Sequence, residues 1–339
     1  MKSPKLSILL LLLFVCSCKQ ETSRAFYYWK SVYKISSSQE KTLSDLKVTK
    51  LYIRFFDVDW NESAGLVTPK AKIRFLEKPS GNFEIIPVVY IVNRSLQKIK
   101  AQQVTAMASN ILKLTNEIAE NNNLSFSEFQ LDCDWTESTR ENYFALLETI
   151  KNNLAPKKII ISATIRLHQV KYQQITGVPP VDRGMLMYYN MGKINTDPAN
   201  NSIFNQDDAA KYIDYIPGYP LKLDAALPAF SWGIHIRKGN IIELLNNMAT
   251  GDFINKGEFI KSENNIYIAQ KSFFYRGYYF MEGDEVKIEE TSPKECHAAA
   301  KQLKSKLNSA GTVAIYHLDS LIFSRYEKQD FEKVFNYYR

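Results

Sequence analysis

The chain has 339 residues, with 43 Lys or Arg against 36 Asp or Glu, and its formal net charge is +7 at neutral pH. The basic residues are scattered and belong to no nucleic-acid motif, which argues against a nucleic-acid-binding protein. The sequence also lacks a Gly-rich phosphate loop, a Cys/His metal constellation and a Gly-x-Ser-x-Gly elbow, so we expect no cofactor and no metal site. Asp57, Asp59 or the acids of the fourth predicted strand could still hold a divalent cation, but carboxylates without constrained spacing are weak evidence for one.

The amino-terminal residues carry the signals of a secreted protein. Lys2 and Lys5 precede an apolar run over residues 8–15, which is too short to cross a bilayer as a helix and is typical of a secretory signal. Residues 15–17 before Cys18 resemble the lipobox of bacterial lipoproteins, in which the cysteine takes the lipid. The resemblance implies a signal peptide over 1–17, lipidation of Cys18 and a tether over 18–25, with cleavage without a lipid as the alternative. We therefore expect a protein of the bacterial cell envelope that is lipid-anchored to a membrane. We expect the outer membrane, with the protein on either of its two faces.

Residues 26–339 should form one domain, because no linker rich in Pro, Gly or Ser divides them. Apolar, β-branched or aromatic runs typical of strands occur at residues 26–33, 51–58, 85–92, 129–135, 159–167, 185–190, 223–230 and 313–318. Helix-like segments separate most of them, at 37–47, 104–121, 138–153, 207–215 and 292–308. Eight strands that alternate with helices predict an α/β fold, the (β/α)8 TIM barrel. The units after the second and fifth strands leave the least room for a helix.

The alternation of strands and helices is interrupted after the seventh strand, at about residues 237–290. Residues 241–248 have a helix-like pattern, the aromatic runs around 266–268 and 273–281 are typical of strands, and Glu282-Gly283-Asp284 is typical of a turn. We therefore predict a small α+β insertion that carries a hairpin. Because it follows a barrel strand, it should stand at the carboxyl end of the barrel, where the active sites of this fold lie.

The fourth predicted strand ends in two alternating carboxylates. Asp132 and Asp134 should face the barrel interior, while Cys133 and Trp135 point to the surrounding helices. Two carboxylates so close repel each other, and one should have a raised pKa, as an acid–base pair needs near neutral pH. The alternative is a pair neutralised by a neighbouring arginine. Glu137, further along, could lean into the barrel mouth or into solvent.

Polar and aromatic side chains at the ends of other strands should surround these acids. On strand five, Arg166 and His168 share the inward parity and could bind an anionic group, hydrogen-bond a polar ligand or neutralise the aspartates. Aromatic rings stack on the C–H faces of sugars, while carboxylates and arginine bind sugar hydroxyls. The predicted ligand-binding residues are Arg54, Tyr90, Arg166, His168, Tyr189, Asn190, Trp232 and Tyr316. The structural alternative is that Arg54 pairs with Asp132 and that the aromatic residues fill the core.

Three of these features together resemble glycoside hydrolase family 18, the chitinase-like barrels: the acids on strand four, Met187-x-Tyr189-Asn190 on strand six and the insertion after strand seven. That family carries Asp-x-x-Asp-x-Asp-x-Glu on strand four, and the resemblance places Asp132 and Asp134 on two of its aspartates. It implies that Asp134 orients, and Tyr189 holds, the N-acetyl group of a substrate. The family's catalytic glutamate is replaced by Thr136, and Glu137 comes one residue late. The tryptophan that the family places at the end of strand eight is absent from residues 314–319.

Nearly the whole predicted mature chain also resembles an uncharacterised group of barrel lipoproteins from Bacteroidetes-type bacteria. The motifs that carry this resemblance are Tyr28-Trp29, residues 55–59, Asp132-x-Asp134-x-x-Glu137 and residues 181–184. It implies the fold and the location but no activity.

Three functions follow from these observations. The first is a membrane-anchored glycoside hydrolase, in which Asp134 or Glu137 is the general acid and Asp132 its partner; side chains two residues apart lie within about 5–7 Å, closer to retaining than to inverting chemistry. The second is a module that binds a carbohydrate at the same cleft without cleaving it. The third is a structural lipoprotein whose acids only neutralise Arg54 and Arg166.

Overall fold

The computed structural model describes residues 21–79, 83–254, 257–307, 309–319 and 322–339. The predicted signal peptide and the lipidation residue Cys18 lie outside these residues. Within the described ranges, no helix has the length and apolar character needed to cross a membrane.

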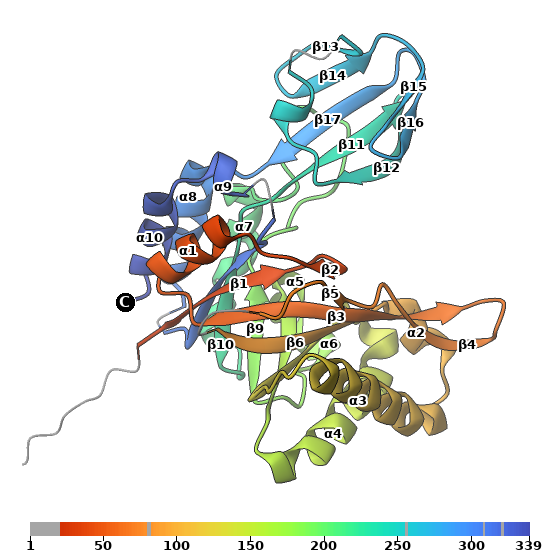
Figure 1. Cartoon of the computed structure of the whole chain (residues 1–339), viewed down its shortest axis with the longest axis vertical. Helices are drawn as coiled ribbons and strands as arrows, with labels where there is room; N and C mark the ends of the chain where they lie inside the picture. The colour runs from red at the N-terminus through yellow and green to blue at the C-terminus, as the bar shows by residue number, and fades with distance from the viewer. Residues whose placement is uncertain (1–20, 80–82, 255–256, 308, 320–321) are drawn as a thin grey trace, which may run out of the picture.

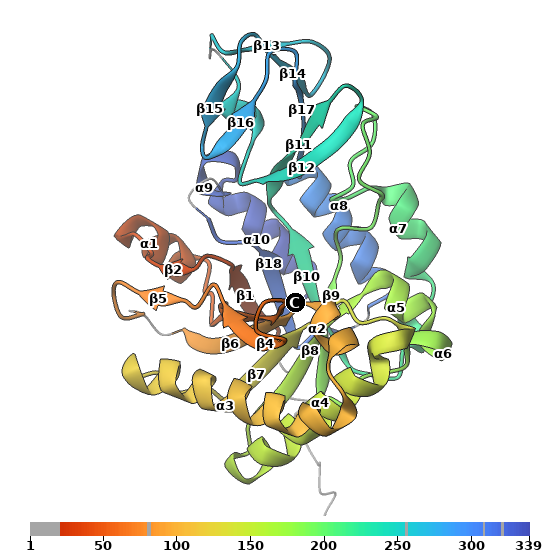
Figure 2. The ribbon, with the colours of Figure 1, turned by 90° about the vertical axis from the view of Figure 1, so that its right-hand side faces the viewer.

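Eight parallel strands close into a barrel, because the first strand pairs with both the second and the last (Figures 1 and 2). In order around the barrel they are β1 (Ser23–Tyr28), β3 (Lys50–Asn61), β6 (Glu84–Ile91), β7 (Glu128–Asp132), β8 (Ile160–Arg166), β9 (Arg183–Met187), β10 (Leu223–Pro228) and β18 (Thr312–Tyr316). Each of the eight predicted runs overlaps one of these strands, so the (β/α)8 TIM barrel is confirmed. The first strand begins at Ser23, within the segment expected to be a tether.

Helices cover the outside of the barrel (Figure 2). They are α1 (Ser37–Asp45), α2 (Asn93–Lys98), α3 (Val104–Asn121), α4 (Arg140–Leu154), α5 (Leu167–Lys171), α6 (Gln173–Thr176), α7 (Gln206–Ile213), α8 (Pro293–Lys304), α9 (Ile322–Arg325) and α10 (Lys328–Asn336). Between β3 and β6 the described residues form β4 (Leu66–Lys70) and β5 (Arg74–Phe75) instead of a helix, and β5 pairs with β2 (Val32–Tyr33). The second and fifth units are thus the ones with short or missing helices, as the sequence predicts.

The start of α8 shows how the local sequence sets an element boundary. Ser292 Oγ accepts a hydrogen bond from the Glu295 N–H at 3.3 Å, and Glu295 Oε2 accepts one from the Ser292 N–H at 2.8 Å. This reciprocal capping box satisfies backbone donors that the helix itself leaves unpaired. Pro293 occupies the first helical position, where its missing N–H has no helical partner to lose.

The interior of the barrel is polar along β7. Glu128, Gln130 and Asp132 point inward. The two residues between them point outward, into the apolar core between the barrel strands and the surrounding helices. Glu128 forms an ion pair with Lys50 at 3.1 Å, and Gln130 accepts a hydrogen bond from Tyr27 Oη at 2.6 Å. Buried polar groups need such partners, so the strand alternation also fixes which side chains can reach the mouth.

The insertion after β10 is a lobe that stands at one end of the barrel (Figures 1 and 2). A five-stranded antiparallel sheet and a hairpin form it, from β11 (Ser231–Arg237), β12 (Asn240–Asn246), β13 (Phe259–Lys261), β14 (Ile266–Ala269), β15 (Phe273–Tyr275), β16 (Tyr278–Phe280) and β17 (Glu285–Glu290). It has its own apolar core, and it also contains a short 3-10 helix, η5 (Thr250–Asp252). The predicted position is therefore confirmed, but the hairpin is not the expected one. The run 273–281 folds back on itself as β15 and β16, and the strand after the Glu282-Gly283-Asp284 turn, β17, pairs with β11 and β14 instead.

The helix predicted over residues 241–248 is wrong, because strand β12 occupies this segment. Lys238 and Gly239 both have positive φ, of 49° and 76°, and turn the chain back so that β12 pairs with β11. Ile241 and Ile242 are 41% and 46% exposed, so the apolar spacing that suggested a helix does not form a buried helical face. The tight turn and the pairing with β11 outweigh that local pattern.

Candidate functional site

Two carboxylates and an arginine meet at the carboxyl end of β7 and β8. Arg166 Nε lies 2.5 Å from Asp134 Oδ1, and Arg166 Nη2 lies 3.9 Å from Asp132 Oδ1. Thr164 Oγ1 donates a hydrogen bond to Asp132 Oδ1 at 2.5 Å. Both aspartates therefore face the mouth as predicted, and the predicted neutralising arginine is Arg166.

Burial differs strongly between the two acids. Asp132 is 5% exposed, whereas the side chain of Asp134 is 49% exposed. Burial raises the pKa of Asp132 to about 6, with Arg166 opposing the rise and Asp134 adding to it. The prediction that one carboxyl has a raised pKa is confirmed, although burial contributes more than repulsion between the acids. The same surroundings, burial first and then the two carboxylates, raise the pKa of Tyr90 to about 12.

Arg54 lies on the neighbouring part of the mouth, and its ion pair differs from the expected one. Its Nη1 lies 3.4 Å from Asp57 Oδ2, and its guanidinium carbon lies 5.6 Å from the centre of the Trp29 ring. Arg54 thus pairs with Asp57 rather than with Asp132. Residues three apart fall on opposite faces of a regular strand, but the pairing of β3 with β6 shifts register between Arg54 and Phe56. This bulge brings Arg54 and Asp57 to the same face.

Aromatic rings connect the acids to Arg54. Tyr316 stacks on Tyr189 with ring centres 5.0 Å apart, and Trp29 lies 5.7 Å from Tyr316 and 6.4 Å from Tyr90. Tyr189 is 4% exposed, so it supports the ring of Tyr316 more than it offers a surface of its own. Offset and edge-on contacts of this kind fix the rings in place.

A cavity of about 480 Å³ opens beside this aromatic cluster, between the barrel mouth and the insertion. It is lined by Trp29, Lys30, Ser31, Arg54, Asn190, Phe230, Ser231, Trp232, Asn246, Asn247, Tyr316 and His317. Four of the predicted ligand-binding residues are among them. Sequence reasoning missed Trp29, Lys30 and His317. Each lies within two residues of the carboxyl end of a barrel strand, which is the signal that could have found them.

The indole of Trp232 is held by the insertion. Its Nε1 donates a hydrogen bond to Glu289 Oε2 at 2.9 Å, and Glu289 Oε1 accepts one from Lys287 Nζ at 2.7 Å. Lys287 and Glu289 are both fully buried, so this ion pair is shielded from solvent. Asn190, on the other side of the cavity, has a positive φ of 54° and is exposed.

Two predicted residues lie elsewhere. Strand β8 ends at Arg166, whose N–H donates to Gln169 Oε1 at 2.8 Å, so His168 falls in helix α5 and is exposed instead of lying at the strand end. Glu137 begins the 3-10 helix η2 (Glu137–Thr139) and is exposed. Thr136, two residues after Asp134, is also exposed, and its hydroxyl lies 3.0 Å from that of Ser138.

Two of the aspartates considered as cation ligands, Asp57 and Asp59, form ion pairs with basic side chains. Asp59 forms short ion pairs with Arg94 and, at 2.6 Å, with Lys70, and these bonds hold its pKa well below the usual range. Asp57 is engaged by Arg54. The described part of the chain contains no group of three or more His, Cys, Asp or Glu residues that could hold a metal ion.

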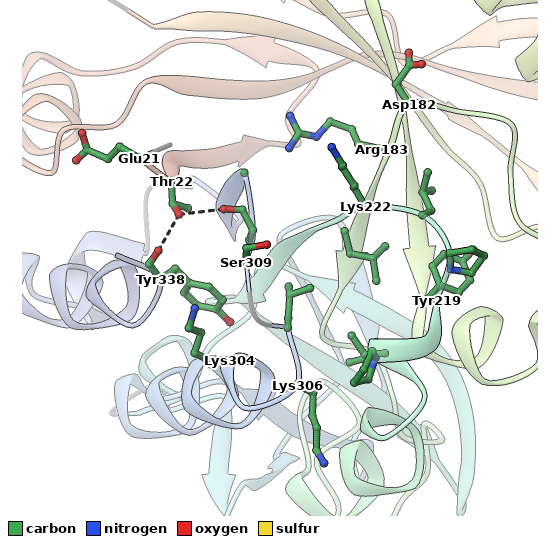
Figure 3. Close-up of a pocket in the computed structure, with 18 of the residues that line it drawn as sticks. Glu21, Thr22, Asp182, Arg183, Tyr219, Lys222, Lys304, Lys306, Ser309 and Tyr338 are labelled. Atoms are coloured by element: carbon green, nitrogen blue, oxygen red, sulfur yellow. Dashed lines mark hydrogen bonds between the residues drawn. The ribbon is translucent and has the colours of Figure 1, made fainter. Parts of the chain in front are cut away.

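A larger cavity, of about 1180 Å³, lies at the opposite end of the barrel, where the strands begin (Figure 3). Residues that precede or start barrel strands line it, including Thr22, Arg183 and Gly311. Thr22 Oγ1 donates hydrogen bonds to the carbonyl oxygens of Ala310 at 3.0 Å and Tyr338 at 2.8 Å. This cavity is remote from the acids, and catalytic sites of the fold lie at the other end, so we place the candidate site at the mouth despite the smaller volume there.

No protein-family model and no curated protein matches the chain. Solved structures match its fold. The spore cortex-lytic enzyme SleL from Bacillus cereus has a TM-score of 0.55 at 15% identity, over 94% of this chain and 75% of that one. SleL from Bacillus megaterium has a TM-score of 0.56 at 12% identity, with the same coverage of 94% and 75%. Catalytic domain 2 of the Group II chitinase from Ostrinia furnacalis, in complex with a chitooligosaccharide, has a TM-score of 0.52 at 11% identity, over 93% and 95%. The chain is therefore similar in fold to the chitinase-like barrels.

Proposed function

We propose that the mouth of the barrel binds a glycan. The observation that carries this proposal is the cavity of about 480 Å³ edged by Trp29, Trp232 and Tyr316 and adjoining the Asp–Arg cluster. Its size falls within the range of small-ligand sites, which combine apolar rings with a few placed polar groups. The rings suit the C–H faces of sugars, and the charged and amide groups suit their hydroxyls. A barrel of similar fold has been solved in complex with a chitooligosaccharide, which supports a glycan as the kind of ligand.

Binding is tested by titrating the full chain with glycans and repeating the titration with Trp232→Ala. Loss of one stacking ring should weaken binding about tenfold, which corresponds to about 1.4 kcal/mol. Phe274→Ala is the matched control, because Phe274 is 75% exposed on the hairpin of the insertion and does not line the cavity. Equal loss of affinity in both variants, or no loss in either, would place the glycan elsewhere.

Hydrolysis of a glycosidic bond is the second candidate, and the raised pKa of Asp132 favours it. A carboxyl that titrates near 6 can hold a proton near neutral pH, as acid–base catalysis requires. In this candidate Asp134 or Glu137 is the general acid that protonates the leaving oxygen, and Asp132 is the partner that takes up and returns a proton near neutral pH. Incubation with chitin-type, peptidoglycan, plant and host glycans should release product that disappears in Asp134→Asn or Glu137→Gln. Product that persists in both variants rules out these acids, and binding without product supports the first candidate.

The chain is also proposed to be lipid-anchored through Cys18, as the resemblance to Bacteroidetes-type lipoproteins implies. Support comes from the direction of β1, because Thr22 lies at the end of the barrel opposite the candidate site. An anchor just before this point leaves the mouth directed away from the membrane. Mass spectrometry of the protein from cell envelopes should find a lipid on Cys18, and Cys18→Ser should release the protein. An unmodified Cys18 would contradict this proposal.

A further inference from the structure

We propose that the cavity beside the acids is an anion-binding subsite, so that the barrel selects a glycan bearing carboxylate or sulfate groups. This inference rests on the proposed glycan binding and adds the chemical class of the ligand. Its basis is the charge of the cavity wall: two lining residues, Lys30 and Arg54, are cationic, and none of the lining residues is acidic.

Arg54 is only partly neutralised by its neighbour. The single ion pair with Asp57 is long, at 3.4 Å, whereas Arg166 has a carboxylate at 2.5 Å and a second one at 3.9 Å. Within the described residues, Nε of Arg54 is buried and has no hydrogen-bond partner. The Trp29 ring below the guanidinium fixes its plane, which is the arrangement in which arginine presents paired donors to an oxyanion.

Lys30 adds a second positive charge to the same wall. It is half-buried, two residues after the end of β1, and takes part in none of the ion pairs found among the described residues. A cation that no protein carboxylate compensates is favourable for a negatively charged ligand, and a cleft with low-dielectric walls strengthens its field.

His317 contributes a polar group without a charge. The residue is 8% exposed and lines the cavity, and its Nδ1 is buried. Burial lowers the pKa of His317 to about 4, with Asp319 opposing the change and Lys30 and Arg325 adding to it. The imidazole is therefore neutral at physiological pH, so it leaves the positive charge of the wall to Lys30 and Arg54.

The two halves of the mouth then impose a direction on the ligand. On the Asp132–Asp134 side Arg166 faces two carboxylates and neutralises only one of them, so this side repels an anion. The Lys30–Arg54 side attracts it, and the aromatic rings lie between the two sides. A neutral sugar fits either half, but an acidic sugar is stable only with its anionic group over Arg54. The subsite thus selects both the kind of glycan and its orientation.

The test compares two ligands that differ only in charge. The full chain is titrated with oligosaccharides of alternating glucuronate and N-acetylglucosamine, and with the same oligosaccharides after reduction of the carboxyl groups to alcohols. A sulfated oligosaccharide of equal length distinguishes a carboxylate subsite from a general oxyanion subsite. We expect at least one of the two anionic ligands to bind about tenfold more tightly than the neutral one, with an advantage that shrinks as salt is added.

Variants then assign the effect to the cavity. Lys30→Gln and Arg54→Gln should remove most of the preference for the anionic ligand, and Asp57→Asn should increase it by releasing Arg54. Lys30→Gln keeps the test valid if the Arg54 variant fails to fold, and Lys113→Gln, on the exposed face of α3, is the matched control.

Failure of this inference is distinguishable from failure of the proposed function. Equal affinity for charged and neutral ligands, both lost in Trp232→Ala, would overturn the anionic subsite and leave glycan binding intact. A preference for charge that survives in Lys30→Gln and Arg54→Gln would also overturn it. Absence of binding to every glycan in the panel would overturn both proposals.

Discussion

Replacement of Asp132 by Asn should stabilise the fold near neutral pH. The carboxyl is 5% exposed and its pKa rises from an ordinary 3.8 to about 6, because burial disfavours the charged form. Above pH 6 the folded protein must keep this group ionised against that preference, which costs about 3 kcal/mol at 1.36 kcal/mol per pKa unit. The amide carries no charge, fills nearly the same volume and still accepts the hydrogen bond of Thr164. The variant should therefore gain up to about 3 kcal/mol in its free energy of unfolding.

The predicted gain in stability depends on pH, whereas a gain that came from packing alone would be the same at every pH. Between about pH 4 and 6 the native state binds more protons at Asp132 than the unfolded state does, so the stability contributed by this group falls as the pH rises. Urea unfolding should show the full difference between variant and wild type at about pH 7.5 and only about 1 kcal/mol of it at about pH 4.5.

Asp134→Asn serves as the control for this experiment. Its side chain is 49% exposed, so loss of its ion pair with Arg166 should change stability by less than about 1 kcal/mol. If Asp132→Asn instead lowers stability at neutral pH, the carboxylate is a structural counter-ion for Arg166, and the reading as a structural lipoprotein gains support. A gain in stability together with lost binding or lost product release would be the behaviour expected of a functional site.

Three further substitutions test other parts of the structure, each by urea unfolding. Glu289→Gln should cost about 3 kcal/mol, because it leaves Lys287 charged and unpaired in a fully buried position, and a change below about 1 kcal/mol would contradict the shielded ion pair. Gly184→Ala should cost about 1–3 kcal/mol, since an added Cβ would lie within 2.7 Å of the nearest side-chain atom, while Gly218→Ala has no atom within 4 Å and should be tolerated. Ser292→Ala should cost about 1 kcal/mol through the lost cap of α8, and unchanged stability would show that the capping box is dispensable.

The fold was accessible from the sequence because each barrel strand is a run of apolar residues set off by helical segments or turns. The alternation along β7 also placed Asp132 and Asp134 on the inner face, as the contacts with Arg166 confirm. Such strand patterns are local and repeat eight times, so errors at single boundaries do not change the topology. His168 shows where this kind of prediction fails. The alternation of side chains predicted that the strand continues to His168, but a hydrogen bond from the Arg166 N–H to Gln169 starts a helix there.

The partners of Arg54 could not be predicted in the same way. The bulge between Arg54 and Phe56 changes the parity of everything after it, and no residue in the sequence marks its position. Lys30 and His317 come from strands at opposite ends of the chain and meet only because the barrel closes between β1 and β18. Their combination into one cavity wall depends on tertiary closure, which a residue pattern along the chain does not contain.

The bonds of Thr22 at the amino end of the barrel have a mechanical consequence. Strand β1 is hydrogen-bonded on both sides, to β3 and to β18, and its first residues are held further by Ala310 and Tyr338. A pull on the chain before Thr22 acts along the axis of β1 and loads the bonds to both neighbouring strands in shear, so that many must break together. A barrel tethered through this end would resist extraction by force better than one held by an edge strand that peels away one bond at a time.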